Sequence, residues 1–174
     1  LNLSSGLMLS DGEAVGQCDF DSIENSKNEL KTNSDNTELL NVAWDTYEKG
    51  DYEQAFNLFN ILSEKGVTEA QAQLGNMLKG GEGVPQNYHQ AFKWIRVSAE
   101  QGSPSGQYYL GLVYNNGVII EENLEKAAKW YQLSAEQGYK DAQYNLGVLF
   151  EHGEGVTQNF QEAFKWYTLS AEQG

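Results

Sequence analysis

Residues 142–174 read AQYNLGVLFEHGEGVTQNFQEAFKWYTLSAEQG, and this stretch decides the fold. Ala142, Leu146 and Phe150 are spaced as i, i+4 and i+8, which places them on one apolar stripe of a helix. The segment 153–156 that follows contains two glycines, and glycine readily adopts the positive φ of a tight turn. The first part of the stretch therefore predicts a helix that ends in a compact loop.

A second helix is predicted to begin after Asn159. The side chain of Asn159 can cap the helix, and Glu162 stands three residues later as in a capping box. Gly174 occupies the place of a C-terminal glycine cap. Gly147 lies beside the apolar stripe of the first helix, where a larger side chain would hold the second helix away. The stretch as a whole predicts two antiparallel helices that pack closely.

The same pattern recurs along the chain at a constant step. The segment SAEQG begins at residues 98, 134 and 170, so both steps are 36 residues. A tryptophan recurs at the same step, at Trp94, Trp130 and Trp166. Such a period predicts an all-α fold, an α/α solenoid (superhelix) of tandem antiparallel helix pairs. The tryptophans are predicted to be core residues, with Trp130 buried between helices.

The period also sets the predicted domain boundaries. Residues 1–36 have no period, are rich in polar and acidic residues, and are predicted to be mostly disordered. Residues 37–174 are predicted to form the helical repeat array. Its predicted units are residues 37–66, 67–102, 103–138 and 139–174.

The loop of the third unit differs from the others. It has Gly117, Val118, Ile119 and Ile120 where its neighbours have Gly-Glu-Gly-Val. Positive φ is energetically unfavourable for a β-branched residue. Ile119 therefore cannot adopt the backbone conformation of the glycines at 83 and 155 without a cost in conformational energy. We expect a locally different loop whose apolar side chains pack against the repeat rather than meeting water.

These motifs resemble the Sel1-like repeat family, a relative of the tetratricopeptide repeat with a longer loop between its helices. The resemblance covers about residues 37–174, and the copy at 142–174 carries nearly every motif position. The pair at 37–66, with its short turn at Gly50-Asp51-Tyr52, looks more like a tetratricopeptide unit. The resemblance implies adaptor or scaffold work, often in bacteria, in which a partner is held in a concave groove.

Composition narrows the classes of function. The net charge of -14 argues against nucleic acid and against an anionic membrane surface as partners. Cys18 is the single cysteine, and His89 and His152 are the only histidines, so no CxxC or HExxH motif exists. We therefore expect no enzyme, no catalytic residue, no metal and no cofactor. The adjacent carboxylates Glu121 and Glu122 are expected to be solvated.

Two other functions are weighed against a non-catalytic protein-binding scaffold. A cysteine-rich branch of the Sel1-like family has been linked to β-lactam binding or hydrolysis, but it carries a cysteine pair in each repeat, which this chain lacks. The other alternative is a structural spacer in a longer envelope or secreted protein. A spacer needs no variable aromatic row, whereas this chain has one.

The predicted binding residues follow from the position of the first helix of each pair. In solenoids these helices line the concave side, and a tetratricopeptide analogy adds Leu40, Ala72 and Lys79 to the lining. Aromatic and amide side chains there suit a peptide or protein partner. The predicted binding residues are Trp44, Tyr47, Asn76, Tyr108, Leu112, Asn115, Tyr144, Val148 and Glu151.

The chain ends carry two further expectations. No run approaches the ~20 apolar residues of a membrane helix, and residues 1–20 lack the basic and apolar regions of a signal peptide. The chain begins with Leu1, so we expect a processed product or a part of a longer protein, and its compartment stays open. The last helix carries Phe164, Trp166, Tyr167 and Leu169 instead of a polar cap. We expect a longer chain, a partner or self-association to cover that C-terminal face.

Overall fold

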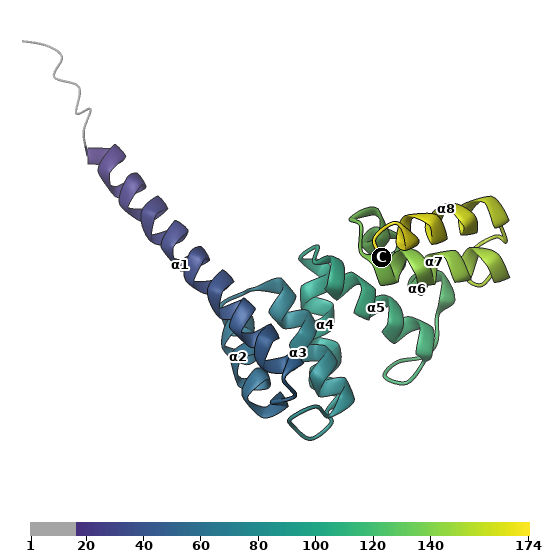
Figure 1. The fold of residues 1–174 in the computed structure, drawn as a ribbon, viewed down its shortest axis with the longest axis horizontal. Helices are drawn as coiled ribbons and strands as arrows, with labels where there is room; N and C mark the ends of the chain where they lie inside the picture. The colour runs from purple at the N-terminus through teal and green to yellow at the C-terminus, as the bar shows by residue number, and fades with distance from the viewer. Residues whose placement is uncertain (1–16) are drawn as a thin grey trace, which may run out of the picture. The chain divides into compact units, whose positions relative to one another are not determined.

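The computed structural model describes residues 17–174, with side chains described from Asn33 onward. Within that part of the chain it has eight α-helices and no strand, which confirms the predicted fold class (Figure 1). The helices are α1 (Gln17–Glu48), α2 (Tyr52–Glu64), α3 (Thr68–Gly80), α4 (Tyr88–Glu100), α5 (Pro104–Asn116), α6 (Leu124–Glu136), α7 (Lys140–His152) and α8 (Phe160–Ala171). The chain divides into two units between Asp35 and Asn36, and the repeat array described below is the unit from Asn36 to Gly174.

The start of α1 differs from the predicted boundary. The helix begins at Gln17, well before residue 37, so residues 17–36 are helical and not without regular structure. The polar composition of this segment suggested disorder, but it contains neither glycine nor proline to stop a helix. A helix that is nucleated by its packed end at 37–48 can therefore extend toward the N-terminus. The prediction for residues 1–16 lies outside the described residues.

The second helix of each pair begins at a polar side-chain cap. Asp51, Asn87, Asn123 and Asn159 each accept a hydrogen bond from a backbone N–H in the first turn of the helix that follows. This confirms the predicted capping role of Asn159, whose Oδ1 accepts from the backbone N–H of Glu162 at 3.1 Å. The caps satisfy N–H groups that a helix start otherwise leaves without a partner.

The two helices of a pair meet at a glycine. A Cβ on Gly111 would lie 2.5 Å from Cδ1 of Tyr131, and one on Gly147 would lie 2.8 Å from Cδ1 of Tyr167. At Gly75, a Cβ would lie 2.6 Å from Cγ1 of Ile95. The expectation that Gly147 allows close packing is therefore confirmed. The glycine lowers the helix propensity of the first helix but lets a large side chain of the second helix lie directly on its backbone.

In α6 the buried core side chain is the residue after the repeated tryptophan. Tyr131 is 1% exposed and lies against Gly111, whereas Trp130 is only half-buried. The prediction that Trp130 is buried between the helices is therefore wrong. Trp130 packs on a cluster that combines Ile95 of the preceding repeat with Leu110 of its own repeat, and this contact leaves the residue only partly buried. Trp166 at the same position is 7% exposed.

The glycine loops of the second and fourth units lie on the preceding repeat. A Cβ on Gly83 (φ +72°) would be 2.3 Å from the backbone oxygen of Tyr52, and one on Gly155 (φ +68°) would be 2.2 Å from that of Leu124. No side chain fits in this contact. Ile119, at the same place in the third unit, therefore requires a different loop.

The third loop uses its apolar side chains for packing in part. Ile119 and Ile120 are half-buried against a cluster that includes Leu110 and Val113, as expected. Val118 is 62% exposed, so the expectation of packing is wrong for this residue. One apolar side chain of the loop is thus left at the surface.

Replacing Ile119 with glycine is expected to lower the free energy of unfolding by about 1 kcal/mol, because the variant loses a half-buried side chain. Urea denaturation followed by circular dichroism measures this change. Val118→Ala is the matched control and should change stability by less than about 0.5 kcal/mol. An Ile119→Gly variant as stable as the parent would show that the loop gains nothing from this side chain.

Candidate partner-binding surface

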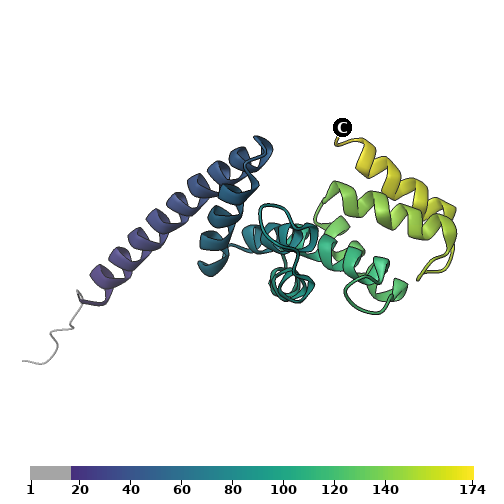
Figure 2. The same ribbon diagram turned by 90° about the horizontal axis from the view of Figure 1, so that it is seen from below.

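The sequence predicts that the first helices of the pairs line the concave side of the array. Within residues 36–174, α3 packs directly on α5, whereas no comparable packing joins α4 with α6 or α5 with α7. Tyr109 on α5 donates a hydrogen bond from its hydroxyl to Oε1 of Gln73 on α3 at 3.3 Å. Figure 2 shows the pairs following one another along a curved path. We call the surface formed by residues 36–48, α3, α5 and α7 the inner surface.

Trp44 and Tyr47 lie at the beginning of the inner surface, and both are tied to carboxylates of the next repeat. The indole N–H of Trp44 donates to Oε1 of Glu69 at 3.2 Å. The hydroxyl of Tyr47 donates to Oε2 of Glu82 at 2.9 Å. Their rings meet edge to face at 5.9 Å, and the side of Trp44 also packs on Phe59. Both residues are half-buried, so they combine packing with an exposed aromatic edge.

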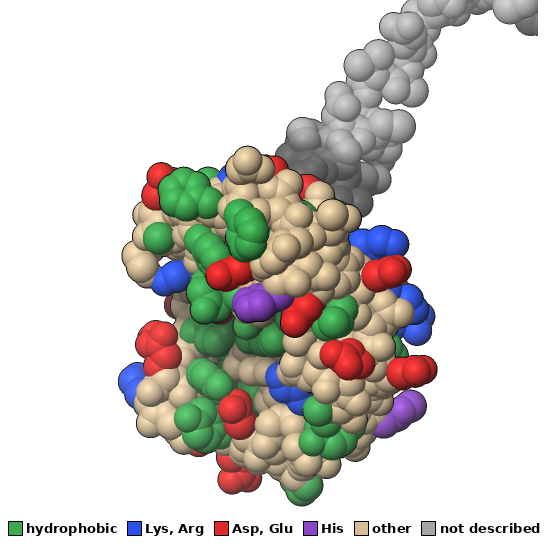
Figure 3. All heavy atoms as spheres, turned by 90° about the vertical axis from the view of Figure 1, so that its right-hand side faces the viewer, with side chains coloured by type: hydrophobic (Ala, Val, Ile, Leu, Met, Phe, Trp, Pro, Cys, Tyr) green, Lys and Arg blue, Asp and Glu red, His purple; other side chains and the backbone are tan. Residues whose placement is uncertain are grey.

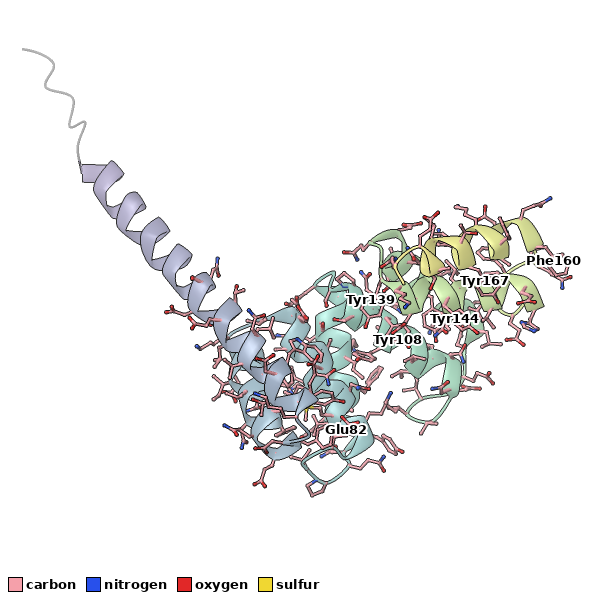
Figure 4. All side chains as sticks on the ribbon, viewed as in Figure 1. Glu82, Tyr108, Tyr139, Tyr144, Phe160 and Tyr167 are labelled. Atoms are coloured by element: carbon pink, nitrogen blue, oxygen red, sulfur yellow. The ribbon has the colours of Figure 1, made fainter. Side chains whose placement is uncertain are left out.

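A group of tyrosines occupies the middle of the inner surface. The ring of Tyr108 lies 5.1 Å from that of Tyr139, 5.4 Å from that of Tyr109 and 6.1 Å from that of Tyr131. Figure 4 shows Tyr108 and Tyr139 side by side. Tyr139 is the residue before α7, and Tyr108 belongs to α5, so two repeats contribute to the group. Rings with this spacing give a rigid aromatic surface.

Tyr144 and Glu151 lie on α7 next to Tyr167 of α8. Tyr144 is 56% exposed, and its ring centroid is 5.5 Å from that of Tyr167. The hydroxyl of Tyr167 donates to Oε2 of Glu151 at 2.6 Å. Glu151 therefore pairs with a tyrosine hydroxyl as Glu82 does, and the pattern of an aromatic ring beside a carboxylate recurs in this repeat.

The remaining predicted residues are less prominent. Leu112 and Val148 are half-buried, and Leu112 packs on the core that α6 and α7 share. Asn76 is half-buried on α3. The amide of Asn115 donates to Oδ1 of the adjacent Asn116 at 3.3 Å. The structure places these side chains on the first helices, where they line the inner surface between the aromatic residues.

Sequence analysis missed three residues of this surface, Tyr109, Tyr139 and Glu82. Tyr139 precedes α7, whereas every predicted binding residue lies within a predicted helix. Its counterparts in the two earlier repeats are Ser103 and Val67, so it changes between copies as the chosen positions do. Variation between copies, extended to the residue before each first helix, would have found it.

Burial, with a smaller contribution from nearby carboxylates, raises the pKa of three tyrosine hydroxyls of the inner surface. Burial, followed by the hydrogen bond to Glu82 and its charge, raises the pKa of Tyr47 to about 12. Burial raises the pKa of Tyr139 to about 12, and the charge of Asp141 adds to the effect. The pKa of Tyr108 is raised for the same two reasons. Since carboxylates disfavour the phenolate form, they would favour a cation near the same rings.

The described residues provide no metal site. Among them no group of three or more His, Cys, Asp or Glu side chains is placed to hold a metal ion. In residues 17–174 there is also no helix that is both long and apolar enough to cross a membrane. The surface is therefore described by its aromatic and carboxylate side chains alone.

The last repeat exposes two large aromatic side chains, Phe160 and Phe164. Phe164 on α8 is 73% exposed, whereas Ala128 at the same position of α6 is 4% exposed. Phe160 is 65% exposed at the start of α8 and points away from the tyrosines in Figure 4. On this side of the array, Figure 3 shows hydrophobic side chains at the surface and in a hollow, with acidic side chains around them.

Tandem helix pairs with a variable inner surface define a protein of the helical-repeat solenoid class. The family model described as Sel1 repeat matches residues 43–67, 68–103, 104–139 and 140–174. The chain therefore belongs to the Sel1 repeat family, as predicted, and proteins of this family are generally protein-interaction scaffolds without catalysis. The match at 43–67 includes the pair that looked tetratricopeptide-like from its short turn.

Solved structures of bacterial proteins share the fold. A Sel1 repeat protein from Oxalobacter formigenes is 34% identical with a TM-score of 0.71, and the match covers 78% of this chain and 54% of that one. The protein c5321, a protective antigen of uropathogenic Escherichia coli with an SLR fold, is 34% identical with a TM-score of 0.69 over 84% of this chain and 33% of that one. The chain thus spans about half and a third of these relatives. Helicobacter pylori cysteine rich protein B shares the fold alone. It is 24% identical, with a TM-score of 0.55, and the match covers 71% of this chain and 89% of that one. A search of curated proteins finds no match.

Proposed function

We propose that the repeat array is a non-catalytic interaction module that binds an extended segment of a partner protein along its inner surface. The segment carries Lys or Arg side chains, which lie over the exposed tyrosine rings and near the carboxylates. The observation that carries this proposal is the repeated pairing of an aromatic residue with a carboxylate, Tyr47 with Glu82 and Tyr167 with Glu151.

The array already contains contacts of the proposed kind. The ammonium group of Lys126 lies 5.2 Å from the ring centroid of Tyr114, and that of Lys165 lies 4.8 Å from that of Trp166. A cation over an aromatic face contributes about 0.5–1 kcal/mol when exposed and about 2 kcal/mol or more when desolvated. The net charge of -14 would also steer a basic segment toward the array.

The test uses a fluorescein-labelled peptide of about 15 residues with alternating arginine and leucine, and fluorescence anisotropy reports its binding. Tyr144→Ser should weaken binding by about 5–30-fold, because truncating an interface aromatic costs about 1–2 kcal/mol. Tyr144 is suitable because it is 56% exposed, so its loss should leave the fold intact.

Two matched variants control for general effects. Leu133→Ser removes a side chain that is 45% exposed on α6, outside the inner surface, and should leave binding unchanged. Glu151→Gln should weaken binding and reduce its salt dependence more than Glu136→Gln does, although both remove one charge. Equal losses for the inner-surface variants and their controls would show nonspecific attraction to an acidic protein and would refute the proposal.

We also propose that the array self-associates through the exposed aromatic residues of α8 when nothing else covers them. The observation is the 73% exposure of Phe164, at a position that is buried in α6. Light scattering of the chain should show an apparent mass that rises with concentration, because exposed apolar patches favour association. Phe164→Ser should lower this mass, whereas Leu133→Ser should not. A strictly monomeric parent at high concentration would contradict the proposal.

A further inference from the structure

A pocket of about 220 Å³ lies beside the unusual third loop. It lies between α3, α4, α5 and the loop after α5. Its lining includes Lys79, Tyr88, Leu112, Val113, Val118 and Ile119. Two of these residues, Lys79 and Leu112, also belong to the predicted inner-surface row. The pocket therefore opens next to the proposed groove without using its tyrosines.

The substitution of a glycine by Ile119 explains why the pocket exists here. In the second and fourth units the loop glycine lies directly on the first backbone carbonyl of the preceding second helix, at Tyr52 and Leu124. The corresponding residue for the third loop is Tyr88, the first residue of α4. Ile119 cannot approach that carbonyl as glycine does, so the third loop cannot lie on Tyr88 in the same way. Tyr88 and Ile119 instead both line the pocket, together with Val113 and Val118.

The chemistry of the pocket is asymmetric. Most of its lining residues are apolar, Lys79 is its one charged residue, and Asn116 is also part of the lining. The Lys79 ammonium is half-buried and lies 5.9 Å from the ring centroid of Tyr109. The ion pairs of the described residues, Arg96–Glu100 and Lys165–Glu162, do not include it. Burial lowers the pKa of Lys79, and the charge of Glu82 offsets this only in part.

We propose that this pocket binds a bulky apolar group with an adjacent carboxylate, as at an apolar C-terminal residue of a peptide. The apolar group fills the space between Tyr88, Val118 and Ile119, and the carboxylate pairs with Lys79. The volume is below the roughly 300–1,000 Å³ of pockets that enclose drug-sized ligands, so it suits one such residue. The Lys79 ammonium is partly desolvated and has no ion-pair partner among the described residues. An anion that pairs with such an ammonium is stabilised more than an anion that pairs with an ammonium in open water.

The first test uses N-acetylphenylalanine and its amide as probes. Both are titrated into the chain with ¹³C-labelled Ile and Val methyl groups, and NMR shifts of Val113, Val118 and Ile119 report binding. A ligand of this size should bind with a dissociation constant on the order of 1 mM. The acid should bind at least about fivefold more tightly than the amide. Absence of shifts in these methyl groups at about 10 mM acid would overturn the proposal.

Three variants separate the two halves of the site. Lys79→Met should remove the preference for the acid but keep binding of the amide, whereas Lys129→Met, on α6 and outside the pocket, should change neither. Ile119→Gly should abolish binding of both probes, because the loop regains a glycine and the pocket loses a wall. A preference for the acid that persists in Lys79→Met would assign the carboxylate elsewhere and refute the site. Since the lining of the pocket does not include Tyr47, Tyr108 or Tyr144, the result is independent of the proposed binding of a basic segment.

Discussion

Replacing Tyr131 with alanine is expected to lower the free energy of unfolding of the array by about 3–5 kcal/mol, the range for large-to-small changes of buried aromatic residues. Tyr131 is 1% exposed, and its ring lies against Gly111 of the facing helix and 6.1 Å from the ring of Tyr108. Its removal leaves a cavity between α5 and α6. Urea denaturation followed by circular dichroism measures the loss.

A comparison with the neighbouring residue, Trp130, makes this prediction more specific. Trp130 is larger but only half-buried, so Trp130→Ala should cost clearly less than Tyr131→Ala. Tyr131→Phe keeps the ring and should cost no more than about 1.5 kcal/mol, since it removes only the hydroxyl. A larger loss for Trp130→Ala than for Tyr131→Ala would show that the repeated tryptophan is the main core contact after all.

The contrast between these two residues shows what the sequence could predict. The period of 36 residues, the caps at Asn159 and its counterparts, and the close packing at Gly147 all follow from local rules. Burial of one aromatic residue rather than its neighbour depends on the rotation of a helix about its axis. A recurring tryptophan marks a packing position, but Trp130 is half-buried whereas Trp166 is 7% exposed, and only the structure shows this difference.

The inner surface also has features that the sequence predicts and features that only the structure shows. Its helices and most of its aromatic residues could be predicted, because repeats restrict each face of a helix to a few positions. The contacts between repeats could not, since Tyr47 meets Glu82 and Tyr109 meets Gln73 across long separations in the chain. The pocket beside Ile119 was also beyond prediction. The substitution at Ile119 predicts a different loop, but not that Ile119 and Tyr88 would line one pocket.

Replacing Gly111 with alanine is expected to have the second-largest effect on stability, a loss of up to about 2 kcal/mol in the free energy of unfolding. An added Cβ would lie 2.5 Å from Cδ1 of Tyr131, and such overpacking costs about 1–3 kcal/mol, while alanine returns about 1 kcal/mol of helix propensity. Because the clash is with one ring, the effect should depend on that ring. In a Tyr131→Leu background, Gly111→Ala should be neutral or should stabilise by up to about 1 kcal/mol.

This double-mutant cycle tests the reason for the glycine and not merely its importance. If Gly111 is needed to admit Tyr131, the two changes will couple strongly, as contacting residues do. If Gly111→Ala is equally harmful with Leu at position 131, the glycine serves another purpose, and the shared packing rule of Gly75, Gly111 and Gly147 fails at the middle repeat. Gly102→Ala is a useful comparison, because nothing lies within 4 Å of its added Cβ and only its φ of +87° opposes the change. Gly102→Ala should therefore lower the free energy of unfolding by the same amount in the parent chain and in the Tyr131→Leu variant. This comparison separates the effect of backbone strain from the effect of the steric contact that the cycle measures.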